Sequence, residues 1–227
     1  MARTKRGLAT RAAFRDAART VFARDGYLNA RLVDIAEEAE RSPGLLYQHY
    51  DGKAELLADL ADNFSEELRE AVKQAGRTGP RAPVDLRPQI QAFWLTYRRR
   101  MGEVVGITQA AAVDPEFRQR WKELQRESTD MVARGIRHAQ EEGFCPTVDP
   151  ILAASALTLM VENFCAFWQH QGGFDDVQMT DDQAVDTLYE LWRHAIYWKP
   201  APTGDATADS LIPAAASLST DSDSMPA

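Results

Sequence analysis

The stretch LVDIAEEAERSPGLLYQHY, residues 32–50, decides the fold. Its first half predicts a short helix over 32–39, because apolar residues recur there at three- and four-residue spacing: Leu32, Ile35, Ala36 and Ala39. Ser42 followed by Pro43 predicts a second helix start, since serine caps helix N-termini and proline fits the first turn. That helix is expected to end near Tyr50. Two short helices joined by a tight turn indicate a helix-turn-helix.

The flanking segments also have helical patterns. A helix is expected from about Thr10 to Arg24, ended by Asp25-Gly26, with an apolar face formed by Phe14, Ala17, Ala18, Val21 and Phe22. A longer helix over 53–75 follows, because apolar residues recur every fourth position: Leu56, Leu60, Phe64, Leu68 and Val72. Residues 10–75 are therefore predicted to form three helices and a fourth, longer helix that connects them to the rest of the chain.

The remainder of the chain predicts further helices and no strand. Residues 76–88 are rich in glycine and proline and predict a loop or domain joint. Helix caps and apolar spacing predict the later helices, over 89–100, 103–113, 115–142, 150–171 and 181–199. Residues 200–227 are mostly Ala, Ser, Thr, Asp and Pro and are expected to be disordered. The predicted fold class is all-α.

The charge is unevenly distributed along the 227 residues. The net charge of -8 argues against a nucleic-acid binder when the chain is taken whole. Up to Arg24, however, seven basic residues stand against one acidic residue, which gives +6. This basic head on an acidic body suggests that the two parts have different partners.

Several classes of protein are disfavoured. Two cysteines exclude a disulfide scaffold and a four-cysteine metal site, and fit a reducing cytoplasm. Secretory signal and membrane span are not predicted, since the longest apolar stretch, 151–161, is short and interrupted. The four histidines form no metal or di-iron motif, and nucleophile-elbow and phosphate-loop motifs are missing. We therefore expect neither an enzyme nor a bound metal or cofactor.

The N-terminal residues resemble those of a known family, the TetR transcriptional regulators. The resemblance covers roughly residues 10–60 and rests on Gly26-Tyr27, Asp34-Ile35-Ala36, Ala39, Ser42-x-Gly44-x-Leu46-Tyr47-x-His49-Tyr50 and Lys53-x-Glu55-Leu56-Leu57. It implies a cytoplasmic homodimeric repressor released from its DNA operator by a small effector. The implied domains are a basic arm 1–9, a DNA-binding domain 10–52, a connecting helix 53–75, a ligand-binding and dimerisation domain 76–199, and the tail.

In a helix-turn-helix the second helix lies in the major groove, with its N-terminal residues near base edges. Gly44 would let the backbone approach DNA, Gln48 can pair with adenine, and Leu45 can pack on a thymine methyl group. The resemblance implies phosphate contacts by Tyr47 and His49, and Lys53 can meet a phosphate beside a helix N-terminus. The predicted DNA-binding residues are Arg31, Arg41, Ser42, Pro43, Gly44, Leu45, Tyr47, Gln48, His49 and Lys53.

Two positions depart from the family pattern. Glu40 and Arg41 stand where the turn usually has glycine and a small apolar residue, so Glu40 must be left-handed or the turn must differ. Ala30 and Arg31 replace a capping threonine, which leaves Asn29 as a substitute N-cap. We expect Arg31 and Arg41 to contact phosphates or bases.

The body is predicted to bind the effector and the second subunit. Pocket candidates are the aromatic and polar residues of its middle helices, which favour an apolar or aromatic effector: Trp94, Tyr97, Arg98, Trp121, Glu162, Asn163 and Phe167. The dimer interface is predicted on the last two helices, at Leu157, Phe164, Trp168, Leu188, Trp192 and Ile196. The alternative interpretation is that the predicted pocket residues and the predicted interface residues all pack in the core of a monomer. The alternative function is a helical ligand-binding or scaffold protein that does not read DNA.

Overall fold

The computed structural model describes residues 5–78 and 86–200, which form helices and loops without a β-strand. The helices are α1 (Lys5–Asn29), α2 (Leu32–Glu38), α3 (Pro43–Tyr47), α4 (Lys53–Thr78), α5 (Arg87–Arg99), α6 (Met101–Val113), α7 (Pro115–Glu141), α8 (Pro150–Gln169) and α9 (Asp181–Ile196). The all-α fold class is confirmed. Residues 201–227 of the expected disordered tail, residues 1–4 of the arm and residues 79–85 lie outside the described residues.

The local signals in the sequence predicted the helix starts well. Ser42, Asp114, Asp149 and Thr180 each cap a helix through a side-chain oxygen, and Thr180 forms the predicted capping box with Gln183. The helix ends were predicted less well. α1 extends to Asn29 through a kink at Gly26, where φ is 75°, and α3 ends at Tyr47 rather than near Tyr50.

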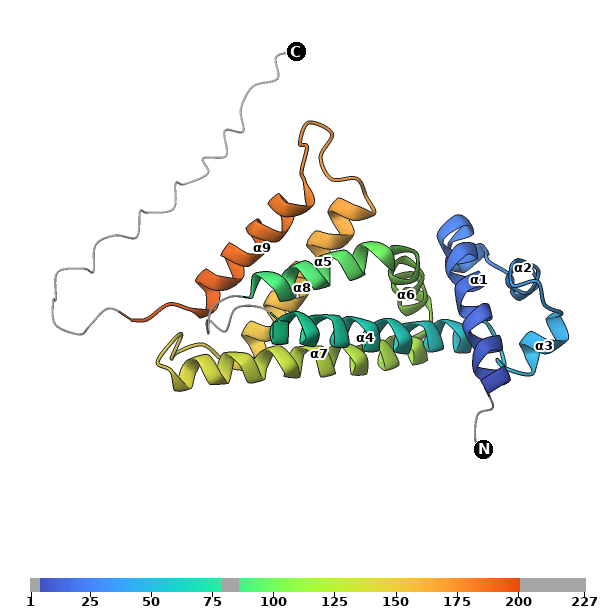
Figure 1. Ribbon diagram of the computed structural model, residues 1–227, viewed down its shortest axis with the longest axis horizontal. Coiled ribbons are helices and arrows are strands. Elements are labelled where there is room, and N and C mark those ends of the chain that lie inside the picture. Colours follow the sequence, from blue (N-terminus) through green and yellow to red (C-terminus); the bar gives the residue numbers. More distant parts are fainter. Residues whose placement is uncertain (1–4, 79–85, 201–227) are drawn as a thin grey trace, which may run out of the picture.

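The first three helices form a head at one end of an elongated molecule (Figure 1). α4 runs from the head into the body and packs against α5 and α7, while α8 and α9 lie toward the opposite end. The core of the head is not closed by the head alone. Phe22, Ile35 and Leu46 pack in one cluster with residues of α4 and α6: Leu56, Leu57, Leu60, Ile107 and Ala110.

The contact between α1 and α6 explains two glycines that weakened the prediction of α6. A Cβ atom placed on Gly102 would lie only 2.8 Å from the Cβ of Ala23, so the two helices touch where neither has a large side chain. A Cβ on Gly106 would lie 3.5 Å from a methyl group of Leu57. Glycine here serves close helix packing, and α6 is regular from Met101 to Val113.

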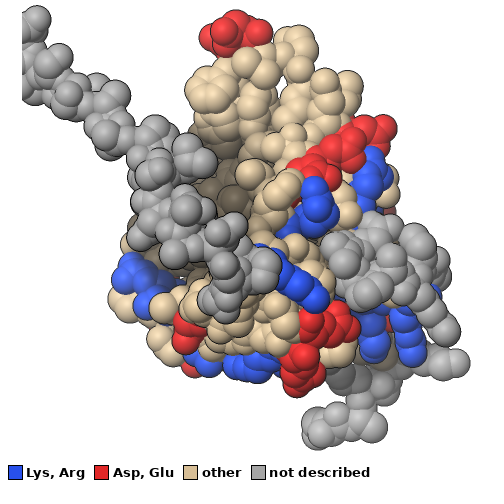
Figure 2. Space-filling view, turned by 90° about the vertical axis from the view of Figure 1, so that its left-hand side faces the viewer, with Lys and Arg blue, Asp and Glu red and all other residues tan. Residues whose placement is uncertain are grey.

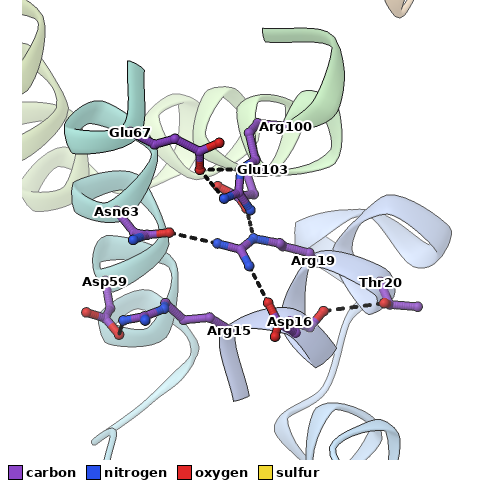
Figure 3. A network of polar contacts seen from close by, with 9 residues as sticks. All are labelled: Arg15, Asp16, Arg19, Thr20, Asp59, Asn63, Glu67, Arg100 and Glu103. Atoms are coloured by element: carbon purple, nitrogen blue, oxygen red, sulfur yellow. Dashed lines mark hydrogen bonds and ion pairs between the residues drawn. The ribbon is translucent and has the colours of Figure 1, made fainter. Parts of the chain in front are cut away.

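A polar network joins the head to the body beside this contact (Figure 3). Arg19 of α1 binds the carboxylate of Glu103 on α6 and donates a hydrogen bond of 2.8 Å to Asn63 on α4. Arg100, which follows α5, binds the same carboxylate at 3.1 Å and also binds Glu67 of α4. Glu103 is 1% exposed. Burial raises the pKa of Glu103, while the two arginines oppose that shift.

We expect Glu103→Ala to lower the free energy of unfolding by about 3 kcal/mol, because it leaves Arg19 and Arg100 without a shared buried carboxylate. Urea denaturation measures this change. The matched control is Asp62→Ala, which removes a half-exposed partner of Arg120 and should cost less than about 1 kcal/mol. Equal losses in the two variants would contradict a structural role for the buried network.

Candidate nucleic-acid interface and ligand cavity

The turn between α2 and α3 has the geometry of a helix-turn-helix. Glu40 adopts a left-handed φ of 52°, as its place in the turn required. The Arg41 amide then donates to the Ala36 carbonyl at 3.0 Å, and the Ser42 hydroxyl accepts from the Leu45 amide at 3.2 Å. The turn therefore keeps its shape with a glutamate in place of glycine.

One face of the turn and of α3 is open to solvent. Its exposed residues are Arg41, Ser42, Pro43, Gly44, Tyr47 and Gln48. A Cβ atom on Gly44 would meet nothing within 4 Å, so the protein itself gives no reason for a glycine there. Leu45 and His49 are half-buried instead: Leu45 packs against the head core, and the His49 ring lies 6.0 Å from that of Phe14. These two residues have less surface to offer DNA than predicted.

Lys53 does not present a free ammonium group, which corrects the prediction of a phosphate contact by its side chain. Its Nζ donates hydrogen bonds to the carbonyls of Tyr27, Leu28 and Ala30 at 2.6, 3.1 and 2.9 Å. It also lies 4.6 Å from the centre of the Tyr27 ring. An ammonium group has three hydrogens, and all three have partners. Burial lowers the pKa of Lys53. Lys53 therefore fastens the start of α4 to the α1–α2 connection.

Arg31 and Arg41 differ in whether their guanidinium groups are paired with a carboxylate. Arg31 binds Asp34 through two hydrogen bonds of 2.9 and 2.6 Å, and this contact raises the pKa of Arg31. Arg41 donates only to the carbonyl of Glu40 and has no carboxylate partner among the described residues. The proposed substitute cap is wrong, because Asn29 donates to the Asp25 carbonyl while Arg31 takes the N-cap position of α2.

Much of the basic charge on α1 is directed into the protein. Arg11 and Arg15 each lie 3.3 Å from Asp59 of α4, which also accepts a hydrogen bond of 2.6 Å from the Tyr50 hydroxyl. Burial would raise the pKa of Asp59, but the Tyr50 hydrogen bond and the arginines lower it below its ordinary value. Together with Arg19, these residues account for three of the seven cations that suggested a basic DNA-binding head. These arginines hold α1 against α4 and α6. The excess of basic residues near the N-terminus therefore indicates a DNA interface less directly than expected.

The body contains an apolar cavity of about 230 Å³ between α4, α5, α7, α8 and α9. Its walls are mostly aliphatic and aromatic, and include Leu68, Val72, Phe93, Met131, Val161 and Trp192. Gln89, Ser128 and Thr158 are polar lining residues, and Arg69 is the one charged residue. An apolar cavity with a few polar groups in its wall is typical of a small-molecule site.

None of the seven predicted pocket residues lines this cavity. Trp94 and Arg98 bind the carboxylate of Asp181 at 2.9 and 2.7 Å beside a second, polar cavity of about 500 Å³. Tyr97 belongs to the body core, and Trp121 packs between the head and body cores. The remaining three are Glu162, which is hydrogen-bonded to Gln125, Asn163, which is exposed, and Phe167, which packs on Trp168. Burial raises the pKa of Glu162 to about 7. The predicted residues therefore include core positions such as Tyr97 and exposed positions such as Arg98 and Asn163, and they lie outside the apolar cavity.

Some apolar side chains of α8 and α9 are exposed within the described part of the chain. Leu152 and Leu159 on α8 and Leu191 on α9 are at least half exposed. Three predicted interface residues, Leu157, Leu188 and Ile196, are buried in the chain's own core and leave little surface for a partner; Phe164, Trp168 and Trp192 are half-buried. Figure 2 views this end of the molecule, whose upper part is largely uncharged apart from an acidic group at the tip.

α8 also changes one expectation about membranes. By length and composition it could cross a bilayer, contrary to the prediction from residues 151–161, and 28% of its apolar window is buried. Core helices of soluble proteins meet the same test. Most of α8 is at least partly buried, and its exposed residues are Leu152, Ala156, Leu159 and Asn163.

Comparisons with known proteins match both parts of the chain. The model for bacterial regulatory proteins of the tetR family matches residues 14–60, and that for the C-terminal domain of the transcriptional regulator EthR matches residues 86–198. The chain is 30% identical over 174 residues to the HTH-type transcriptional repressor AcnR of Corynebacterium diphtheriae, covering 76% of this chain and 88% of that protein.

Two further matches agree with these. The HTH-type transcriptional regulator EthR of Mycolicibacterium smegmatis is 26% identical over 168 residues, covering 72% of this chain and 75% of EthR. A crystal structure of AibR in complex with isovaleryl coenzyme A and operator DNA shares the fold, with a TM-score of 0.63 at 20% identity, covering 80% of this chain and 97% of that one. The relatives are regulators and not enzymes. The chain therefore belongs to the TetR family of DNA-binding transcriptional regulators.

Proposed function

We propose that this chain is a dimeric cytoplasmic repressor that binds its operator through α3 and leaves it when a small molecule fills the apolar cavity. The observation that carries the DNA-binding part is the open face of α3, where Gly44 is exposed and has empty space around it. A glycine that no intramolecular contact requires is explained by close approach of another molecule. The operator of AibR and the repressor activity in the name of AcnR support the same interpretation.

The proposed groove contacts follow from exposure. Gln48 is free to pair with adenine, and Pro43 and Gly44 lie at the N-terminal end of α3, where a recognition helix meets base edges. Tyr47, which is 56% exposed, is placed to reach a phosphate. Few side chains reach bases, so the sequence-dependent shape of the DNA should contribute to specificity.

The proposed dimer uses the uncovered face of α8 and α9. Leu152 and Leu159 lie seven positions apart on one side of α8, and Leu191 extends the apolar surface onto α9. Pairing this face with its copy in a second subunit buries it. Two heads can then reach successive major grooves, about 34–36 Å apart.

The proposed release depends on α4, which contributes to both the head core and the cavity wall. Leu56 and Leu60 lie in the head core, whereas Leu68 and Val72 line the cavity. A ligand shifts the protein away from the DNA-bound state only if it binds the other state more tightly, typically by about 1–3 kcal/mol of coupling.

Gly44→Ala should weaken operator binding without harming the free protein. Alanine favours a helix over glycine by about 0.5–1 kcal/mol, whereas its methyl group would hold the backbone off the DNA at a cost of about 1–3 kcal/mol, similar to a lost base contact. The operator can be selected from random DNA with the wild-type protein. Val113→Ala is the control, because Val113 is also an exposed helical residue, 61% exposed, and lies outside both α3 and the cavity wall. If Gly44→Ala binds the operator as tightly as the control does, α3 is not the DNA-reading helix.

Arg41→Ala should reduce the salt dependence of operator binding, because the Arg41 guanidinium group is exposed and has no carboxylate partner among the described residues. Loss of one phosphate contact lowers the slope of log affinity against log salt by about 1. Arg31→Ala should have a smaller effect, since Asp34 already neutralises Arg31. Unchanged operator affinity in both variants would exclude these two arginines from the interface.

Leu159→Glu should convert the dimer into a monomer, because it places a charge in the centre of the proposed interface. Sedimentation equilibrium measures the change. Val113→Glu is the control, since Val113 is 61% exposed on α6 and lies away from the α8–α9 face. A dimer that survives Leu159→Glu, or one that is lost equally in the control, contradicts this interface.

A further inference from the structure

We propose that the effector is a small uncharged molecule with an apolar body and one group that both donates and accepts hydrogen bonds, such as a primary amide or an alcohol. This inference rests on the proposed function, since it assumes that the apolar cavity is the effector site. It narrows the expected apolar or aromatic effector to a chemical class. Three observations on the cavity wall support it: two unpaired polar atoms, one neutralised charge and a small volume.

Two polar atoms in the cavity wall are buried without partners. Gln89 Oε1 on α5 and Thr158 Oγ1 on α8 have no hydrogen-bond partner within the described parts of the chain, and Thr158 is 7% exposed. A buried polar group without a partner destabilises the protein, because it has lost its hydrogen bonds to water. The amide oxygen of Gln89 can only accept, whereas the Thr158 hydroxyl can donate. A ligand with an N–H or O–H group and an acceptor oxygen would satisfy both.

The charge at the cavity disfavours an anion. Among the residues that the structure describes, Arg69 is the one charged lining residue, and its guanidinium group binds both Glu66 and Glu127. A ligand carboxylate would have to displace one of these glutamates and would then lie near the other. A neutral ligand meets no such competition, because the remaining lining residues are uncharged.

The volume limits the size of the ligand. The cavity volume of about 230 Å³ lies below the roughly 300–1,000 Å³ of typical small-molecule pockets. A nucleotide-bearing thioester such as isovaleryl coenzyme A cannot enter whole. The cavity therefore fits a short-chain or single-ring molecule with one polar end.

The test compares three ligands of nearly equal size, hexanamide, 1-hexanol and hexanoate, by calorimetry on the full-length protein. We expect hexanamide and hexanol to bind and hexanoate to bind at least tenfold more weakly. Thr158→Val should weaken hexanamide binding roughly three- to tenfold, the loss expected for one hydrogen bond. It should also raise the melting temperature of the ligand-free protein, because it removes an unpaired buried hydroxyl group.

Thr187→Val is the matched control, since the Thr187 hydroxyl donates to the Gln183 carbonyl on the surface of α9. It should leave hexanamide binding unchanged. Hexanoate binding as tightly as hexanamide, no binding by either neutral ligand, or hexanamide binding that Thr158→Val does not weaken would each overturn the ligand class. Operator binding is measured with the same ligands. Ligands that bind as expected but leave operator affinity unchanged support the ligand class and overturn the cavity's proposed role in release.

Discussion

The contact between α1 and α6 is the constraint on which the placement of the head depends. Gly102 meets Ala23 there without intervening side chains, and Glu103 binds Arg19 of the head and Arg100 of the body. Close backbone approach and a buried carboxylate both require a defined distance between the two helices. The head is therefore attached to the body through packing and charge as well as through the chain connection at α4.

The sequence allowed the local structure of the head to be predicted because its signals are local. A serine before a proline, a glycine after a helix and four-residue apolar spacing act within one or two turns, and the structure has the corresponding caps and faces. The role of Lys53 could not be obtained in this way. Its partners are backbone carbonyls more than twenty positions earlier, and these become neighbours only when α1, α2 and α4 pack together. The same holds for the arginines of α1. The sequence gives their number, but it does not show whether their side chains face the protein or the solvent.

The apolar cavity could not be predicted from the sequence for a related reason. Its wall combines residues of five helices, and each one looks like an ordinary core position in its own helix. The aromatic residues that seemed to favour a pocket fill the core or bind Asp181 instead. Thr158 did carry a weak signal, as a hydroxyl group within an otherwise apolar helix, whereas Gln89 lies in a helix with many polar residues. Three of the residues predicted for the dimer interface, Leu157, Leu188 and Ile196, lie in the chain's own core, because α8 is apolar on opposite sides and periodicity does not show which side faces inward.

The length of α4 has a geometric consequence for regulation. Leu56 in the head core and Val72 at the cavity are separated by roughly 24 Å at 1.5 Å per residue. The helix is therefore a lever arm, and each degree by which it tilts about its cavity end displaces the head end by about 0.4 Å. Hydrogen bonds to base edges tolerate only a few tenths of an ångström before they weaken. In a dimer the two arms diverge or converge together, so a rotation of a few degrees would be enough to put both recognition helices out of register with the grooves.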